Sequence, residues 1–190
     1  MKRRNAIGGI LGLAGLSYAS VIGVRLFKEN SVKSRGMLAV HVSFIAELVD
    51  VIIPASTSPS ATMAGVQHYV IDYMEDCSSQ KEYNNFLNGL HDLRDRCKNT
   101  HGCNFENCSI AQKNELLENL DNSWRSKGLL MKLNNKLLGS SFFYLLKTLT
   151  IEGYCTSFLG ATEHLEYLPI PSRYKSITLL KPNQKSWATK

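Results

Sequence analysis

The helical spacing of apolar residues is the feature that most limits the folds open to this chain. The longest periodic run spans residues 127–154, where leucine and phenylalanine recur at intervals of three and four. Its apolar stripe consists of Leu130, Leu133, Leu137, Leu138, Phe142, Leu145, Leu146 and Leu149. Such spacing lines one face of an α-helix, whereas a half-buried β-strand needs strict alternation. The chain holds no convincing alternating run, so the sequence predicts an all-α fold.

Four shorter segments show the same spacing and are expected to be helices. They are residues 42–54, 62–77, 78–97 and 109–120. The apolar stripe of the third consists of Tyr83, Phe86, Leu87, Leu90 and Leu93. Because each helix has one apolar face to bury, we expect a compact bundle of about five to six helices behind the N-terminal segment.

Side chains near the helix ends support these boundaries. Ser43 and Thr62 are the expected caps of the first two segments, and Pro54 is expected to end the first. Ser109 followed by Gln112 forms the pattern of a capping box, in which the two side chains satisfy each other's backbone amides. The fourth helix is therefore expected to begin at residue 109.

The first thirty residues have the layout of an export signal. Lys2, Arg3 and Arg4 precede an uncharged, glycine-rich stretch over residues 5–24. The pair Arg3-Arg4 directly before a weakly apolar run indicates the twin-arginine route, which exports folded proteins. We therefore expect residues 1–30 to be a twin-arginine-type signal peptide or an uncleaved signal-anchor, with a buried N-terminal helix as the alternative. The chain is then periplasmic, and an uncleaved segment would tether it to the inner membrane.

The export segment also explains most of the basic charge. Residues 1–30 hold five basic residues and one acidic residue, so they carry +4 of the total charge of +6. The remaining chain is only weakly basic, and a nucleic-acid partner is not expected, because its electrostatic footprint should lie on the folded domain. We expect a single helical domain over residues 37–180 and a flexible tail over residues 181–190.

Residues 96–108, RCKNTHGCNFENC, place Cys97, Cys103 and Cys108 near His101. The spacing C-x5-C-x4-C lacks the paired short spacings of zinc sites, and neither C-x-x-C-H for haem nor C-x-x-C for redox chemistry occurs. Disulfides form and persist in exported proteins. We expect one disulfide among these three cysteines, with a metal or unpaired thiols as alternatives, and the sequence does not choose the pair.

Two further cysteines, Cys77 and Cys155, lie in helical segments and are expected to be buried thiols. The five histidines show neither H-x3-H nor H-E-x-x-H spacing. His164 lies between Glu163 and Glu166, a pattern that suits an acid–base site but is more typical of a solvated face. With no nucleophile elbow and no phosphate-binding glycine loop, we predict no catalytic, cofactor-binding or metal-binding residue.

Two stretches resemble the signatures of the gluconate 2-dehydrogenase subunit 3 family. Residues 47–74, ELVDVIIPASTSPSATMAGVQHYVIDYM, are similar to its N-terminal signature, and residues 149–174, LTIEGYCTSFLGATEHLEYLPIPSRY, to its C-terminal signature. The motif residues are Asp50, Ile53, Pro54, Pro59, Gly153, Tyr154, Tyr167 and Pro169. Ser60 and Ser172 stand where the family usually has glycine.

The resemblance implies an accessory subunit without its own cofactor. Its partner would be a large FAD-dependent dehydrogenase of the glucose-methanol-choline type, which oxidises a sugar, sugar acid or alcohol. A c-type cytochrome with haem would be a further partner. The small subunit would assist folding, assembly and export of the flavoprotein through the twin-arginine translocase. A self-standing helical enzyme and a metal- or haem-binding electron carrier are the alternatives.

Overall fold

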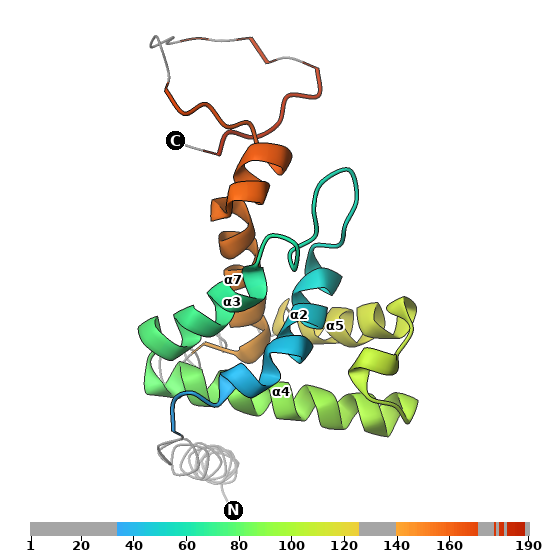
Figure 1. Ribbon diagram of the computed structural model, residues 1–190. Coiled ribbons are helices and arrows are strands. Elements are labelled where there is room, and N and C mark those ends of the chain that lie inside the picture. Colours follow the sequence, from blue (N-terminus) through green and yellow to red (C-terminus); the bar gives the residue numbers. More distant parts are fainter. Residues whose placement is uncertain (1–33, 126–139, 171–176, 178, 181, 189–190) are drawn as a thin grey trace, which may run out of the picture. The chain divides into compact units, whose positions relative to one another are not determined.

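Helices make up nearly all regular structure in the computed structural model (Figure 1). The structure describes residues 34–125, 140–170, 177, 179–180 and 182–188. The chain divides into two compact units, and Arg35–Lys190 form the second. The predicted signal over residues 1–30, and the first part of the periodic run at 127–154, lie outside the described residues.

The described part of the chain confirms the all-α class. Its short helices are η1 (Leu38–His41), η2 (Tyr73–Cys77), η3 (Phe105–Asn107) and η4 (Gly160–His164), and its α-helices are α2 (Val42–Ile52), α3 (Val66–Asp72), α4 (Gln80–His101), α5 (Ile110–Arg125) and α7 (Phe142–Thr156). Extended backbone pairs here only in an isolated bridge between Glu166 and Trp187. None of the helices in this part combines the length and apolar content needed to cross a bilayer.

The core forms where α7 packs against α2, α3, α4 and α5. The predicted stripe of α4 is fully buried, and the described members of the α7 stripe are buried. These are Tyr83, Phe86, Leu87, Leu90 and Leu93 on α4 and Phe142, Leu145, Leu146 and Leu149 on α7. The helical spacing therefore predicted the buried face of both elements correctly.

Glycine sets the distance between α4 and α7. A Cβ atom at Gly89 would lie 2.2 Å from Cγ of Phe142, the first residue of α7. The rings of Phe86 and Phe142 meet edge to face at 5.2 Å between centroids. Ser140 and Ser141 precede α7 outside any helix, so the periodic run is interrupted there.

Helix starts follow the predicted caps in only one of three cases. The Ser109–Gln112 capping box is present, with the Ser109 amide donating to Gln112 Oε1 at 2.9 Å. Ser43 caps nothing, because α2 continues directly from η1 and begins at Val42. A capping box that the sequence analysis missed, Ser79 with Glu82, begins α4.

Thr62 was also predicted as a cap, and this is wrong. Its amide donates to Oδ1 of Asp50 at 2.8 Å, and its hydroxyl donates to the carbonyl of Ala46 at 3.1 Å. Thr62 thus fastens the loop after α2 back onto α2. The start of α3 is set by Gly65, whose φ of +76° favours glycine.

Glu75 anchors the N-terminal edge of the domain. Its carboxylate accepts hydrogen bonds from the amides of Gly36 (2.7 Å) and Leu38 (3.2 Å) and from the hydroxyl of Tyr83 (3.1 Å). Arg35 donates to the carbonyl of Ser78 at 2.7 Å. The folded unit therefore includes residues 35 and 36, just before the predicted boundary at 37.

Candidate functional site

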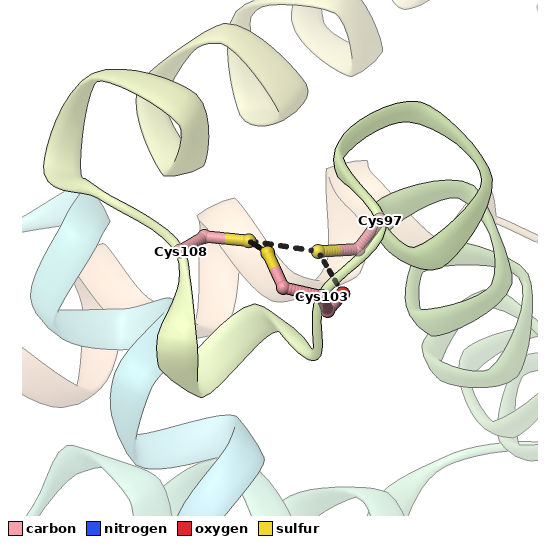
Figure 2. A group of neighbouring side chains, drawn as sticks. All are labelled: Cys97, Cys103 and Cys108. Atoms are coloured by element: carbon pink, nitrogen blue, oxygen red, sulfur yellow. Dashed lines mark hydrogen bonds between the residues drawn. The ribbon is translucent and has the colours of Figure 1, made fainter.

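The three cysteines singled out in the sequence converge in one cluster, here called the thiol cluster (Cys97, Cys103 and Cys108). Figure 2 shows their sulfur atoms facing one another between the end of α4 and the start of α5. All three Sγ atoms lie within 4.8 Å of one another. Two of the residues, Cys97 and Cys108, are buried, and Cys103 is half-buried.

Local backbone geometry brings these residues together. Cys97 lies one turn before the end of α4, which Gly102 terminates with a φ of +71° and an amide hydrogen bond to the Lys98 carbonyl. This αL glycine reverses the chain, as is common after helices. The turn η3 then carries the chain to Cys108, whose amide donates to the Phe105 carbonyl at 3.1 Å.

The sulfur atoms are unusually close. Sγ of Cys108 lies 2.7 Å from Sγ of Cys103 and 3.2 Å from Sγ of Cys97. The Cys97 thiol also donates to the carbonyl of Cys103 at 3.3 Å, and the Cys108 thiol donates to that of Asn104 at 3.4 Å. No disulfide joins them in this structure. The disulfide expected from the sequence stays a prediction, and the sulfurs of Cys103 and Cys108 lie closer together than those of Cys97 and Cys108.

The thiol cluster favours the protonated state. Burial raises the pKa of Cys97 above its ordinary value, and burial likewise raises the pKa of Cys108. The hydrogen bond with Cys108 is the largest cause of the raised pKa of Cys103. Low-pKa, electropositive surroundings are typical of reactive cysteines, so this cluster is not built as a free nucleophile.

Aromatic and charged residues surround the thiol cluster. Phe105 is buried and packs edge to face on Phe44 with 5.4 Å between ring centroids. Nζ of Lys113 lies 5.4 Å from the Phe105 ring centroid and 2.7 Å from Oε2 of Glu47. Beside the cluster, a pocket of about 270 Å³ is lined by Arg94, Lys98, Asn104, Phe105 and Glu106.

His101 shares the turn but does not join the sulfur triangle. Among the described residues, no histidine or carboxylate lies close enough to all three sulfurs to form a fourth member of the group. The Nε2 atom of His101 is buried and makes no hydrogen bond with the described part of the chain. The sequence placed His101 near the cysteines correctly, but its side chain takes a separate position.

The two signature segments, residues 47–74 and 149–174, meet in a second region, here called the signature junction. The hydroxyl of Tyr154, which is fully buried, donates to the Pro59 carbonyl at 2.7 Å. A Cβ atom at Gly153 would lie 2.6 Å from Cδ1 of Tyr69, so α7 and α3 touch here. Asp50 holds the same loop from the other side through the Thr62 amide.

The remaining motif residues frame this junction. Ile53 follows the last residue of α2, and its carbonyl accepts from the Ala61 amide at 3.1 Å. Pro54 comes directly after it and begins the loop, as predicted. Tyr167 and Pro169 are exposed beyond η4. The motif spacing thus reflects one structural unit: a loop clamped between α2, α3 and α7.

His164 lies at the edge of the signature junction. Its Nδ1 lies 3.3 Å from the Ser58 hydroxyl, and its ring meets Tyr154 at 5.5 Å between centroids. His164, Glu163 and Glu166 are all exposed. Glu163 and Glu166 are engaged through their backbone, the first by Lys185 and the second by Ser186 and Ala188. These contacts are structural and do not assemble an acid–base pair.

Exposed apolar side chains continue from the signature junction to the end of the described chain. They are Phe158, Tyr167, Leu168, Ile170, Ile177, Leu179, Leu180 and Trp187. We call this series the C-terminal apolar segment. Sequence analysis missed it, because these residues lie outside the helical segments whose spacing predicts burial. Its apolar residues were visible in the sequence, but their exposure depends on the fold.

One cysteine prediction is wrong. Cys77 was expected to be a buried structural thiol, and it is exposed at the end of the π-helix η2. The π-helix has more residues per turn than an α-helix, so the last residues of the segment are rotated. The α-helical spacing therefore does not predict which of them are buried. Cys155 is half-buried.

Comparison with known proteins gives one match. A family model described as gluconate 2-dehydrogenase subunit 3 matches residues 39–171. The matched region runs from η1 to just beyond η4 and contains both the thiol cluster and the signature junction. No curated protein and no solved structure matches the chain.

Proposed function

Because the chain belongs to the gluconate 2-dehydrogenase subunit 3 family, we propose that it is the non-catalytic accessory subunit of an exported, membrane-associated dehydrogenase. Family membership implies association with other subunits of a dehydrogenase complex. The partner proposed here is a large FAD-dependent subunit of the glucose-methanol-choline type, which oxidises a sugar, sugar acid or alcohol. A c-type cytochrome is the proposed electron acceptor.

The observation that carries this proposal is the C-terminal apolar segment. Scattered exposed apolar residues are normal on a soluble protein, whereas a continuous apolar surface marks an interaction site. Among the described residues between positions 158 and 180, Phe158, Ile170 and Leu180 are each exposed by 79% or more. The series begins at Phe158, just after the last residue of α7, Thr156, and next to the signature junction. The segment therefore suits a subunit interface.

The export role rests on the N-terminal sequence. Arg3 and Arg4 precede a weakly apolar, glycine-rich stretch, the arrangement of a twin-arginine signal. A flavoprotein takes up FAD in the cytoplasm and must then cross the membrane folded. An accessory subunit that carries the signal would bring such a partner through the twin-arginine translocase.

The test replaces Arg3 and Arg4 together by lysine in cells that also produce the large subunit. This change keeps the charge but removes the twin-arginine pair. We expect dehydrogenase activity to disappear from the periplasm while the flavin-loaded large subunit accumulates in the cytoplasm. Arg25→Lys, the same exchange behind the apolar stretch, is the matched control and should leave export intact.

Full export of both chains in the double lysine variant would contradict the escort role. Co-purification of the two chains from the same cells tests the subunit role separately, because assembly does not depend on the export route. The alternative of a self-standing enzyme at His164 receives no comparable support, since that side chain is exposed and forms a hydrogen bond with the Ser58 hydroxyl.

A further inference from the structure

The thiol cluster has the geometry of a ligand set, and nothing in the proposed subunit role requires one. Sγ of Cys108 lies 2.7 Å from Sγ of Cys103 and 3.2 Å from Sγ of Cys97. Non-bonded carbon atoms, which are smaller than sulfur, pack at about 3.5–4.0 Å. Three independent thiols would therefore be overcrowded at these distances. A covalent bond or a shared cation would relieve the crowding.

The sulfur atoms form a triangle rather than a line. All three lie within 4.8 Å of one another, so the third side cannot be long. Three ligands that surround one ion need such a convergent arrangement. Zinc–sulfur bonds of about 2.3 Å place the sulfurs of a tetrahedral site about 3.8 Å apart. An opening of the triangle by roughly 1 Å would produce that spacing.

The fold holds the three residues from separate supports. Cys97 is fixed on α4 in the core, Cys103 follows the Gly102 reversal, and Cys108 follows η3. This separation explains why the sequence spacing C-x5-C-x4-C gave no metal signal. Sequence rules for zinc sites expect short paired spacings on one turn, whereas here a helix end and a loop supply the convergence.

We propose that in the reduced protein Cys97, Cys103 and Cys108 together bind one thiophilic cation, with zinc(II) as the ion that fits best. Thiolate sulfur is a soft ligand that favours zinc and copper(I) over hard cations. Three thiolates and a zinc dication leave a single net negative charge. Copper(I) would leave two. This proposal replaces the sequence-based expectation that the chain holds no metal ligand.

The half-buried Cys103 provides access from solvent. Zinc bound by three protein ligands commonly takes water in its fourth position. A water molecule could occupy that position on the side of Cys103. The other two residues, Cys97 and Cys108, are buried in the core. The site is therefore closed on the core side and open towards the loop.

The cation and the predicted disulfide exclude each other. Joining Cys103 to Cys108 requires a two-electron oxidant, such as a disulfide compound, which takes up the two electrons while both thiols lose their protons. The bonded sulfurs can then no longer act as two thiolates. The reduced chain thus binds the metal, whereas the oxidised chain forms the Cys103–Cys108 disulfide.

The experiment titrates cobalt(II) into the full chain, purified reduced and freed of metal under anaerobic conditions. Cobalt(II) replaces zinc in such sites and shows intense thiolate-to-metal charge-transfer absorption. We expect one cobalt per chain, displaced by an equivalent of zinc. Cys103→Ser should weaken binding at least tenfold, and Cys108→Ser should abolish the charge-transfer band. Oxidation with a small disulfide should also remove binding.

Matched controls separate the site from general thiol binding. Cys77→Ser and Cys155→Ser lie outside the thiol cluster and should bind cobalt like the unchanged chain. Thermal unfolding followed by circular dichroism checks that each variant is folded. Cys103→Ser is the most informative variant, because its side chain is only half-buried and the change should disturb folding least. The proposal is wrong if the reduced chain shows no thiolate charge transfer. It is equally wrong if folded Cys103→Ser binds with full strength.

Discussion

At the scale of single residues, His41 combines burial with unfavourable neighbours. It is the last residue of η1, its Nδ1 has no hydrogen-bond partner in the described chain, and its ring meets His91 edge to face at 5.3 Å. Burial lowers the pKa of His41 below its ordinary value of 6.5, and the nearby Arg94 and His91 lower it further. The folded protein therefore favours the neutral imidazole.

This lowered pKa gives a prediction for stability against pH. Below about pH 6.5 the unfolded chain binds a proton at residue 41 that the folded chain resists. Stability from this residue is thus present above that pH and is lost as pH falls towards the folded pKa. We expect the midpoint of thermal unfolding to drop between pH 7 and pH 5, and His41→Phe to reduce that drop.

The exposed His68 provides the matched control, since His68→Phe removes a histidine without removing a buried one. Calorimetry at several pH values measures both variants. An unchanged acid slope in His41→Phe, or the same reduction in His68→Phe, would show that residue 41 does not carry the effect.

At the scale of the elements, the contact between α3 and α7 depends on the absence of a side chain at Gly153. In an exposed helix, replacing glycine by alanine stabilises by up to about 1 kcal/mol. Here the added Cβ would lie 2.6 Å from Cδ1 of Tyr69 and 3.0 Å from its Cγ. The ring would have to move within a packed interface, and overpacking of this kind costs about 1–3 kcal/mol.

We therefore predict that Gly153→Ala destabilises the domain by about 1–3 kcal/mol in chemical denaturation, although helix propensity alone predicts the opposite sign. Thr148→Ala, at an exposed position of the same helix, is the control and should be neutral or slightly stabilising. A stabilised Gly153→Ala variant would show that Tyr69 can move without cost and that the close approach is not important for stability.

The elements also show what sequence patterns could and could not reveal. Helical spacing identified the buried stripe of α4, and the Ser-x-x-Gln pattern identified the capping box of Ser109 and Gln112. Both features depend on residues close in sequence. These patterns missed the role of Thr62, a loop residue whose partner Asp50 lies in α2. The cysteine pattern predicted a disulfide between two of Cys97, Cys103 and Cys108, but not the convergence of all three sulfurs. That convergence depends on where the chain turns after α4.

At the scale of the whole molecule, the family match and the helical fold agree, and exposed apolar residues extend past the end of the matched region. The matched region ends at residue 171, whereas exposed apolar residues continue to Leu179, Leu180 and Trp187. Residues 186–188 return to Glu166 through two backbone hydrogen bonds, 2.8 Å and 2.9 Å long. The end of the C-terminal apolar segment is thus hydrogen-bonded to the residue two positions beyond η4.

If this segment holds the large dehydrogenase subunit, charged replacements in it should disrupt the complex. Interface energy concentrates in a few well-buried apolar anchors, where removal costs about 2 kcal/mol or more. We predict that Phe158→Glu combined with Leu180→Glu lowers the amount of co-purified large subunit at least tenfold and leaves the thermal midpoint of the isolated chain unchanged. Val40→Glu is the matched control, because Val40 in η1 is 83% exposed, compared with 79% for Phe158. Equal losses in the control would indicate a general effect of added charge. Undiminished co-purification in the double variant would place the subunit interface on another surface of the helical domain.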